Sequence, residues 1–282
     1  MTTWGMVGLG EMGLPMARNL VAAGIPTAGY DPDPVARAAA AEAGVVLVDA
    51  PRELLERCDV VGVCVRDEAQ CVEVADALGE GAGTVVLHST IGPSGARRLA
   101  ERVGARGQRL LDAPISGMAM RAQAGTLTFL VGGDTADLEL SRSGLLAMGE
   151  RIFHLGDIGT GQVAKLANNL ASLSTVLVVH EAIELGVRGG VPEEAMLEVL
   201  RASSGDSWIA RNWGWLRHEW RHEHPLGGDG VGDMVGKDLR LALAVGDEVG
   251  LALPSTALAA QLVPLVVGRD QVVGDAPRLV RE

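Results

Sequence analysis

The chain of 282 residues is short of cysteine, of long apolar runs and of lysine, and the first two shortages exclude classes of protein. Its cysteines, Cys58, Cys64 and Cys71, are odd in number and show no CxxC spacing, so neither a disulfide framework nor a zinc site is indicated. No stretch approaches about 18 continuous apolar residues, and no basic segment precedes an apolar run near the first residue. We therefore expect reduced thiols, no signal peptide, no membrane partner and a cytoplasmic location.

Basic surface is scarce as well. Lys and Arg number 24 against 36 Asp and Glu, which gives a formal net charge of −12. Nucleic-acid binding needs a basic patch that neutralises phosphates, and none is visible, so we expect no nucleic-acid partner. The rest of the composition, with 48% hydrophobic and 21% charged residues, is typical of a globular protein, and the length is sufficient for two domains.

The shortage of lysine points to chemistry. Only Lys165 and Lys237 are lysine among the 24 basic side chains, and every other one is arginine. An amine can give or take a proton near neutrality, whereas a guanidinium can hardly do so, which makes both lysines candidates for a catalytic role. The alternative is that an arginine-rich composition left two lysines by chance.

Lys165 lies in a segment that predicts one long helix from Gly161 to about Gly186, because apolar residues recur there at helical spacing without a proline. Lys165, Asn169 and Ser172 share one face of this helix. A polar stripe on a buried helix needs a partner, and a polar ligand would supply one. The alternative is a hydrogen-bond network between packed helices.

The start of the chain predicts a strand, a glycine turn and a helix. The apolar run from Met6 to Leu9 leads into a GxGxxG sequence, and Leu14 to Ala23 follows at helical spacing. Glycines here allow a tight turn and the close approach of a pyrophosphate to the amide-rich end of the helix. An accidental glycine-rich turn is the alternative. The candidate cofactor-binding residues of the turn are Gly8, Leu9, Gly10, Glu11 and Met12.

A second strand, from Ile25 to Tyr30, ends in Asp31, which is 18 positions beyond Gly13. An acid at this place can accept hydrogen bonds from both ribose hydroxyls of NAD and would repel the 2′-phosphate of NADP. NAD is therefore the expected cofactor, and NADP remains the second candidate because Arg37 is nearby. The alternative for Asp31 is a helix cap before Pro34.

Short apolar strands and helices alternate as far as Leu87, which predicts a parallel sheet covered by helices on both faces. Ligands of such sheets bind beyond the carboxyl ends of the strands. Val65, Arg66 and the pair Ser89-Thr90 follow strand ends, so we expect them to border the cofactor. Each of them is otherwise an ordinary loop residue.

A later strand is expected to end at Ala113, and Ser116-Gly117 then predicts a turn whose hydroxyl and NH groups can hold a carboxylate. At this point four segments resemble the motifs of the β-hydroxyacid dehydrogenase family, in the family's order and over nearly the whole chain. They are Gly8 to Leu20 (GLGEMGLPMARNL), Asp112 to Gly133 (DAPISGMAMRAQAGTLTFLVGG), Gly159 to Asn169 (GTGQVAKLANN) and Lys237 to Leu243 (KDLRLAL).

The resemblance implies an α/β Rossmann-type N-terminal domain with a parallel sheet over residues 1–160 and an all-α C-terminal domain over residues 161–282. A long interdomain helix would join the two, with the active site between them. The family's activity is the NAD(P)-dependent interconversion of a β-hydroxyacid and its semialdehyde or keto form. Relatives assemble as dimers or tetramers, so a homodimer or homotetramer is expected.

The resemblance also assigns roles to residues. Lys165 matches the catalytic acid/base, and Asn169 matches a residue that helps to hold the substrate's oxygen. Thr90 and Lys237 match positions that touch the nicotinamide end of the cofactor. The role of Lys165 agrees with its chemistry, because a hydroxyl cannot lose hydride unless its proton also leaves, and partial desolvation lowers the pKa of a lysine towards neutrality. For Lys237 the alternative is a salt bridge with Asp238.

Ser116 and Gly117 match the turn that binds the substrate carboxylate, and Met118 is included in that site. Relatives commonly have a second glycine in place of Met118 and small residues in place of Met120 and Arg121, so the carboxylate end should be reshaped here. The stretch Gly227–Asp233 is glycine-rich and acidic, and we expect it to be flexible. The tryptophans and histidines between positions 208 and 224 lack a convincing metal spacing, and no metal is expected.

Three further hypotheses remain open. The chain is an imine or enamine reductase in the first, although such enzymes usually lack a lysine at the place of Lys165. In the second it catalyses oxidative decarboxylation of a sugar acid. In the third it is a sensor or scaffold that binds NAD without turnover, which predicts that Lys165→Ala changes no activity.

Overall fold

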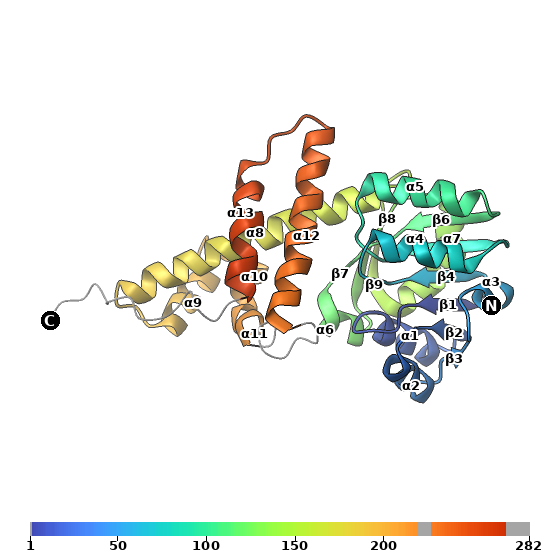
Figure 1. Cartoon of the computed structure of the whole chain (residues 1–282). Helices are drawn as coiled ribbons and strands as arrows, with labels where there is room; N and C mark the ends of the chain where they lie inside the picture. Colours follow the sequence, from blue (N-terminus) through green and yellow to red (C-terminus); the bar gives the residue numbers. More distant parts are fainter. Residues whose placement is uncertain (1, 219–226, 269–282) are drawn as a thin grey trace. The chain divides into compact units, whose positions relative to one another are not determined.

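The computed structural model describes residues 2–218 and 227–268, and the chain forms two compact units, Met1–Lys165 and Leu166–Glu282. Helix α8 (Thr160–Arg188) runs from the first unit into the second (Figure 1). It is the long helix expected from Gly161 to about Gly186, with slightly wider bounds. The predicted domain boundary, between residues 160 and 161, falls in its first turn.

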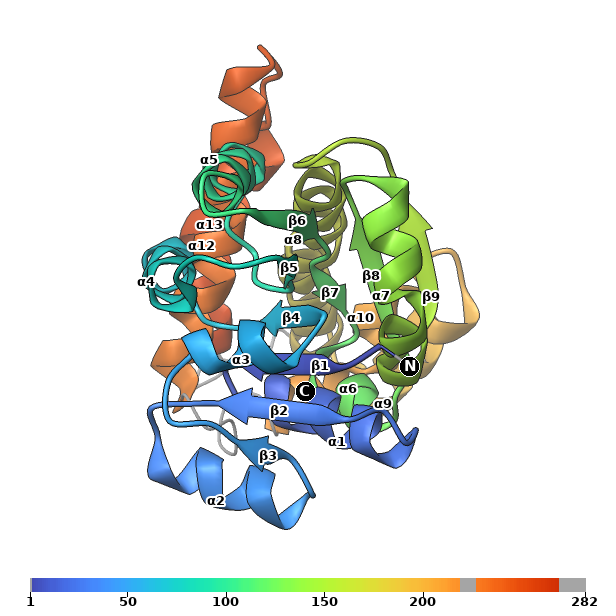
Figure 2. The same ribbon diagram turned by 90° about the vertical axis from the view of Figure 1, so that its right-hand side faces the viewer.

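The sheet of the N-terminal unit has six parallel strands in the order β3-β2-β1-β4-β5-β6, lying side by side in Figure 2. This confirms the expected α/β fold with a parallel sheet. The strands are β1 (Trp4–Val7), β2 (Thr27–Tyr30), β3 (Val46–Leu47), β4 (Val60–Val63), β5 (Gly83–Leu87) and β6 (Gln108–Asp112). The helices that connect them are α1 (Gly13–Ala22), α2 (Pro34–Glu42), α3 (Arg52–Arg57), α4 (Glu68–Leu78) and α5 (Pro93–Gly104).

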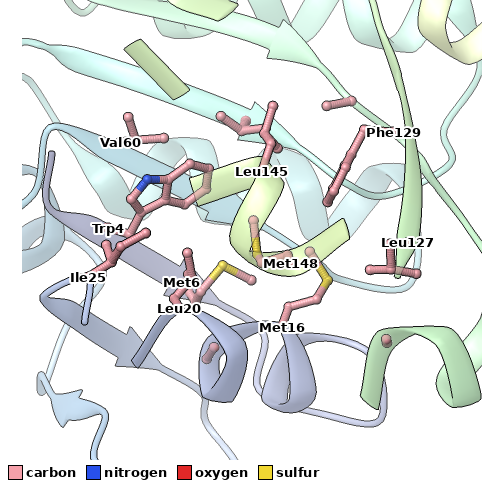
Figure 3. Packing of buried hydrophobic residues seen from close by; sticks show 14 of the residues in the cluster. Trp4, Met6, Met16, Leu20, Ile25, Val60, Leu127, Phe129, Leu145 and Met148 are labelled. Carbon is pink, nitrogen blue, oxygen red and sulfur yellow. The ribbon is translucent and has the colours of Figure 1, made fainter. Parts of the chain in front are cut away.

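Both faces of this sheet are covered by other elements. Successive side chains of a strand point to opposite faces, so each strand contributes to two clusters of buried residues. On one face Trp4 of β1 packs with Leu20 of α1 and with Phe129 and other buried residues farther along the chain (Figure 3). On the other face Val61 of β4 packs with Leu99 and with residues of α3 and α4. Coverage on both faces explains why the strand sequences are apolar throughout.

A second sheet, which the sequence did not predict, contains three strands in the order β7-β8-β9. β7 (Ile115–Ser116) pairs antiparallel to β8 (Leu127–Val131), which pairs parallel to β9 (Gly149–His154). Helix α6 (Met118–Gln123) lies between β7 and β8 in the chain, and α7 (Thr135–Met148) lies between β8 and β9. An antiparallel bridge between Asp112 and Gly132 joins this sheet to the end of β6.

The second unit is helical, as expected. After α8 it contains α9 (Glu193–Ala202), α10 (Trp208–Arg211), α11 (Trp213–His218), α12 (Gly227–Glu248) and α13 (Pro254–Gly268). Along α12, four buried side chains recur at helical spacing, namely Val231, Val235, Leu239 and Ala242.

The expectation of a flexible stretch over Gly227–Asp233 is wrong, because α12 begins at Gly227 and continues through it. Glycine disfavours an isolated helix. Here, however, a Cβ added at Gly232 would lie 3.2 Å from the carbonyl oxygen of Pro264, and one at Gly236 would lie 3.4 Å from the Pro264 ring. The glycines let α13 pack closely against α12, and this packing overrides the weak local propensity.

Among the described residues, α8 is the helix with the length and composition to cross a membrane. A search for continuous apolar runs misses it, because polar residues such as Asn168 and Asn169 interrupt the sequence. Of its apolar 18-residue window 28% is buried, whereas the core helix of a globular protein is mostly buried, so α8 is less buried within this chain than expected. Trp220, His222 and His224 lie outside the described residues, as does the side chain of His218.

Candidate active site

The glycine turn between β1 and α1 uses each of its glycines differently. Gly8 has a φ of +89°, and an added Cβ would lie 2.1 Å from the carbonyl oxygen of Cys64. A Cβ at Gly13 would lie 1.9 Å from the carbonyl oxygen of Gly8. Gly10 differs from both, since a Cβ there would meet nothing within 4 Å. Gly8 and Gly13 therefore build the turn, while Gly10 leaves open space beside it.

The first turn of α1 is also left open by its own side chains. The aspartates Asp33, Asp67 and Asp134 cap α2, α4 and α7 by accepting a hydrogen bond from a first-turn amide. The corresponding residue of α1, Met12, makes no side-chain cap bond, and the first turn carries no acid. Backbone NH groups at the positive end of a helix suit a phosphate. The turn thus fits the pyrophosphate of a dinucleotide.

Asp31 lies beyond the end of β2 and faces the glycine turn. Its Oδ2 accepts a hydrogen bond of 2.7 Å from the backbone NH of Leu9, and its Oδ1 accepts one of 2.8 Å from the NH of Asp33. The cap of α2 is Asp33, so the interpretation of Asp31 as that cap is wrong. A carboxylate has about four lone-pair positions, and the two bonds leave acceptor capacity for ribose hydroxyls.

Arg37, the residue because of which NADP remained a candidate cofactor, is held at the end of β3, the strand that pairs with β2. Its Nη1 donates to the carbonyl oxygen of Val48 at 2.8 Å, and its Nη2 lies 3.4 Å from a carboxylate oxygen of Asp49. A guanidinium committed to these oxygens does not need a 2′-phosphate as a partner.

The side chain of Ser89, after β5, is hydrogen-bonded to the backbone of Val65, after β4. The Ser89 hydroxyl donates to the carbonyl oxygen of Val65 at 2.7 Å and accepts from its NH at 2.9 Å. Val65 lies next to the glycine turn, because its Cγ1 is 3.3 Å from the place of a Cβ on Gly8. Arg66 is exposed, with its Nε 3.9 Å from Asp67, and Thr90 is half-buried in the segment before α5.

Ser116, Gly117 and Met118 form a junction between a strand and a helix rather than an isolated turn. Ser116 ends β7, and Gly117, with a φ of +137°, is the N-cap of α6. A Cβ at Gly117 would lie 2.7 Å from the Cβ of Arg121, so glycine is required. Met118 has a φ of +59°. Among the described residues it is the only non-glycine residue with a positive φ, a conformation that strains a residue with a side chain.

The first turn of α8, which precedes Lys165, is held by a buried carboxylate. Asp112, at the end of β6, accepts hydrogen bonds of 2.8 Å from the NH of Gly159 and 2.9 Å from the NH of Gln162. Burial raises the pKa of Asp112, and these backbone bonds oppose the rise. Lys165, half-buried, lies three residues after Gln162, and Asn169 lies one turn farther along the helix.

Asn169 and Lys237 both contact a residue that the sequence did not single out for chemistry. Asp238, in α12, accepts a hydrogen bond of 2.7 Å from Nδ2 of Asn169. Its other oxygen lies 3.3 Å from Nζ of Lys237, so the salt bridge considered for Lys237 is present. Asp238 is only 9% exposed. Its place directly after Lys237 is the one signal in the sequence that pointed to it.

Within the N-terminal unit, then, the structure brings together the glycine turn, Asp31 and Val65. Within the helical unit it brings together Asn169, Lys237 and Asp238. The strand order 3-2-1-4-5-6, the open first turn of α1 and the acid after β2 define the first unit as a Rossmann-type dinucleotide-binding domain.

Comparison with known proteins agrees with this class. A family model described as the NAD binding domain of 6-phosphogluconate dehydrogenase matches residues 3–156. A second, described as NAD-binding of NADP-dependent 3-hydroxyisobutyrate dehydrogenase, matches residues 159–278. The chain belongs to the β-hydroxyacid dehydrogenase family and is an NAD(P)-dependent oxidoreductase.

Two relatives from Pseudomonas aeruginosa match along almost their whole length. A 3-hydroxyisobutyrate dehydrogenase is 37% identical over 275 residues, covering 94% of this chain and 92% of the relative. An NAD-dependent L-serine dehydrogenase is 34% identical over 276 residues, covering 93% and 91%. The solved structure of Mycobacterium tuberculosis 3-hydroxyisobutyrate dehydrogenase with L-serine has a TM-score of 0.80 at 29% identity, covering 94% of each chain.

Proposed function

We propose that the chain oxidises the primary alcohol of a small 3-hydroxy carboxylic acid to the semialdehyde, with NAD as the preferred cofactor and Lys165 as the acid/base. The observation that carries the proposal is the placement of Lys165. It is one of two lysines in the chain, and the helix turn before it is held by the buried Asp112 through two backbone bonds. A base that must meet one hydroxyl needs such a fixed support.

Lys165 acts on the proton of the substrate hydroxyl. In oxidation its neutral amine accepts the proton as the C–H bond breaks, and in reduction its ammonium returns the proton to the oxygen. Asn169 holds the same oxygen. One N–H of its amide is committed to Asp238 at 2.7 Å, which orients the group and leaves the second N–H for the substrate.

The glycine turn from Gly8 to Met12, the first turn of α1 and Asp31 would hold the dinucleotide. Val65 and Arg66 border it, and Thr90 and Lys237 are assigned to its nicotinamide end. When bound, the nicotinamide ring supplies the acceptor for the hydride. The NAD preference is supported by the acceptor capacity of Asp31 and by the position of Arg37 on Val48.

The substrate class is supported by the relatives' names. 3-Hydroxyisobutyrate and L-serine each carry a carboxylate and a hydroxymethyl group on one carbon. In this chain the Ser116 hydroxyl and the amide of Gly117 are assigned to the carboxylate, and Met118 borders it. A backbone turn with a hydroxyl donor suits an anionic oxygen.

The test is NAD reduction across a panel of 3-hydroxy acids, with Lys165→Met and Lys165→Arg as matched variants. Lys165→Arg keeps the positive charge but cannot act as a base. Both variants should lose kcat by about a thousandfold or more, while the Kd for NAD stays within about threefold. Lys165→Arg turning over at the native rate would exclude the mechanism.

The same panel separates the rival functions. A non-catalytic sensor binds NAD, yet the native chain turns over no hydroxyacid in the panel. An imine reductase consumes NADH or NADPH with a cyclic imine and leaves the hydroxyacids untouched. Either result for the native chain would replace the dehydrogenase proposal.

Assembly as a homodimer or homotetramer, in the cytoplasm, is part of the proposal. It is supported by α8, whose side chains Val178 and Leu185 are 62% and 75% exposed. They lie seven residues apart, on one face of the helix. Apolar surface of this kind on a long helix favours burial against another protein surface, and a second copy of the same chain supplies one.

A further inference from the structure

Gln162 joins the first turn of α8 to the loop that follows β5. The residue is fully buried, with 0% of its surface exposed. Its Oε1 accepts hydrogen bonds from the NH groups of Ile91 at 3.0 Å and Gly92 at 3.2 Å, and its Nε2 donates to the carbonyl oxygen of Ser89 at 3.0 Å. The side-chain amide therefore acts as both acceptor and donor, which a carboxylate cannot do.

Each end of this connection continues into another hydrogen bond. Ser89 is tied to the end of β4 through its hydroxyl and Val65. The backbone NH of Gln162 is held by Asp112 at the end of β6. The bonds thus run across the carboxyl ends of three adjacent strands, β4, β5 and β6, into α8.

Two glycines bring the helix close enough for these bonds. A Cβ on Gly161 would lie 2.7 Å from Oδ2 of Asp112 and 2.2 Å from the carbonyl oxygen of Leu130. A Cβ on Gly132 would lie 2.4 Å from Oδ1 of Asp112. The carboxylate is enclosed by backbone on both sides, so the helix turn has one position in which its amides are satisfied.

We infer that Gln162 and Asp112 are positioning residues for the reaction, which fix the turn of α8 before Lys165 relative to the strand ends that border the cofactor. The inference rests on the proposed role of Lys165. It assigns no contact with substrate to either residue. A base displaced by about 1 Å can lose about a hundredfold in rate, whereas the glycine turn and Asp31, which would hold the pyrophosphate and the ribose, take no part in these bonds.

Gln162→Glu tests the inference because the new side chain has the same shape. An ionised carboxylate still accepts from Ile91 and Gly92, but it cannot donate to Ser89 and is repelled by its carbonyl oxygen. A protonated carboxyl restores that donor, and burial favours the protonated form. The ratio of variant to native kcat should therefore rise as the pH falls from about 9 to about 6, from roughly 0.01–0.1 towards 1, with the Kd for NAD within about threefold of native.

Gln108→Glu is the matched control. Gln108 is also a buried glutamine, and its Nε2 also donates to a backbone carbonyl oxygen, that of Gly79, at 2.7 Å. It lies at the opposite end of β6 from Asp112. A change that acts only through general stability should affect both variants alike. We expect Gln108→Glu to lower the melting temperature without a pH-dependent change in the kcat ratio.

A folded Gln162→Glu with native kcat at every pH, or with the same profile as Gln108→Glu, would overturn the inference. If Gln162→Glu does not fold, Asp112→Asn replaces it. The amide retains one acceptor for the two helix NH groups, so kcat should fall by about tenfold with the NAD affinity kept; native kcat would again contradict the inference.

Failure of the proposed function has a different signature. In that case Lys165→Met is as active as the native chain, or the native chain oxidises no hydroxyacid. Hydrogen exchange at the amides of residues 159–165 then tests, without any activity measurement, whether Gln162 fixes the first turn of α8. Faster exchange in Gln162→Glu than in Gln108→Glu at pH 9 supports it, and equal protection refutes it.

Discussion

The two units of the chain satisfy their buried and apolar groups in different ways. In the N-terminal unit both faces of the sheet are covered, and three aspartates cap the helices that they precede. In the helical unit, α8 and α9 expose large apolar side chains such as Val178, Leu185 and Val199. The first unit also exposes large apolar side chains, such as Val35 of α2 and Val46 of β3, but these lie on separate elements. The second leaves apolar surface that its own helices do not cover.

The polar groups proposed to bind ligands also differ between the two units: they are backbone amides in the first and side chains in the second. In the N-terminal unit the amides at the start of α1 carry no side-chain cap, so this unit is open where a dinucleotide would bind. In the helical unit Asn169 and Lys237 both contact the carboxylate of Asp238. We therefore expect binding of the pyrophosphate to depend on backbone in the first unit, and binding of the substrate's oxygen to depend on side chains in the second.

The largest effect should come from the glycine turn. Gly13→Ala places a methyl group 1.9 Å from a backbone oxygen, where nothing can yield without moving the turn. We expect the free energy of unfolding to fall by about 3–5 kcal/mol in urea titrations. Gly10→Ala is the control, because its Cβ meets nothing within 4 Å. It should keep stability within about 0.5 kcal/mol and yet weaken NAD binding by about tenfold or more.

The pair of glycine variants separates the backbone of the turn from the space beside it. If Gly10→Ala bound NAD as the native chain does, the pyrophosphate would not lie at this turn. If Gly13→Ala were as stable as Gly10→Ala, the turn would be able to shift, and the N-terminal unit would be less rigidly packed than its contacts indicate.

The next effect tests how well the core of the N-terminal unit is sealed. His88 is buried at the end of β5, its Nδ1 lies 3.0 Å from the carbonyl oxygen of Ala113, and its ring packs against Phe129. Burial lowers the pKa of His88 from 6.5 to about 4. The unfolded chain therefore binds a proton between these pH values that the folded chain does not. Stability should fall as the pH falls from 7.5 to 4.5, by about 2.5 kcal/mol from this group.

Urea unfolding of the native chain and of His88→Leu at both pH values isolates this contribution. Carboxylates that titrate in the same range are common to both proteins, so they cancel in the difference. His88→Leu should lose about 2.5 kcal/mol less stability on acidification than the native chain. Equal pH dependence of the two proteins would mean that the ring titrates in the fold as it does in water.

A smaller effect is expected at the ribose end of the cofactor site. Asp31→Ser removes the charge that disfavours a 2′-phosphate, and the ratio of kcat/KM for NAD to that for NADP should fall by about 10- to 100-fold. Asp33→Ser, two residues later, is the matched control, because serine also caps a helix and the ratio should stay unchanged. An unaltered ratio in Asp31→Ser would show that Asp31 serves only the backbone of Leu9 and Asp33.

The sequence predicted those features of the fold and the site that are formed by residues close together in the chain. The strand, glycine turn and helix at the start of the chain, and the acid after β2, occur within about 30 consecutive residues, and their geometry follows from residue type. The long helix with Lys165 and Asn169 on one face follows from its periodicity. The sequence therefore predicted the fold and the local part of the candidate site.

The remaining features depend on segments that meet only in the fold. Asp238 reaches Asn169 across 69 positions, and Gln162 reaches Ser89 across 73. No periodicity or spacing within either segment encodes such a pairing. The glycines at the start of α12 misled the prediction for the same reason, because the space beside Gly232 and Gly236 is defined by Pro264 of α13. Local propensity predicts the secondary structure of a segment only where no contact with a distant segment overrides it.

The smallest effect on the stability of one chain should come from the exposed face of α8. Val178→Glu with Leu185→Glu changes two exposed side chains, so the stability of the folded monomer should shift by no more than about 0.5–1 kcal/mol. If the chain assembles through this face, as proposed, the mass measured by light scattering should nevertheless fall from that of an oligomer towards that of one chain. Val35→Glu is the control in the N-terminal unit, where an equally exposed valine (73%) lies in the first turn of α2. If Val35→Glu dissociated the assembly and the α8 variant did not, the uncovered surface that matters would belong to the first unit, and the contrast between the two units would be reversed.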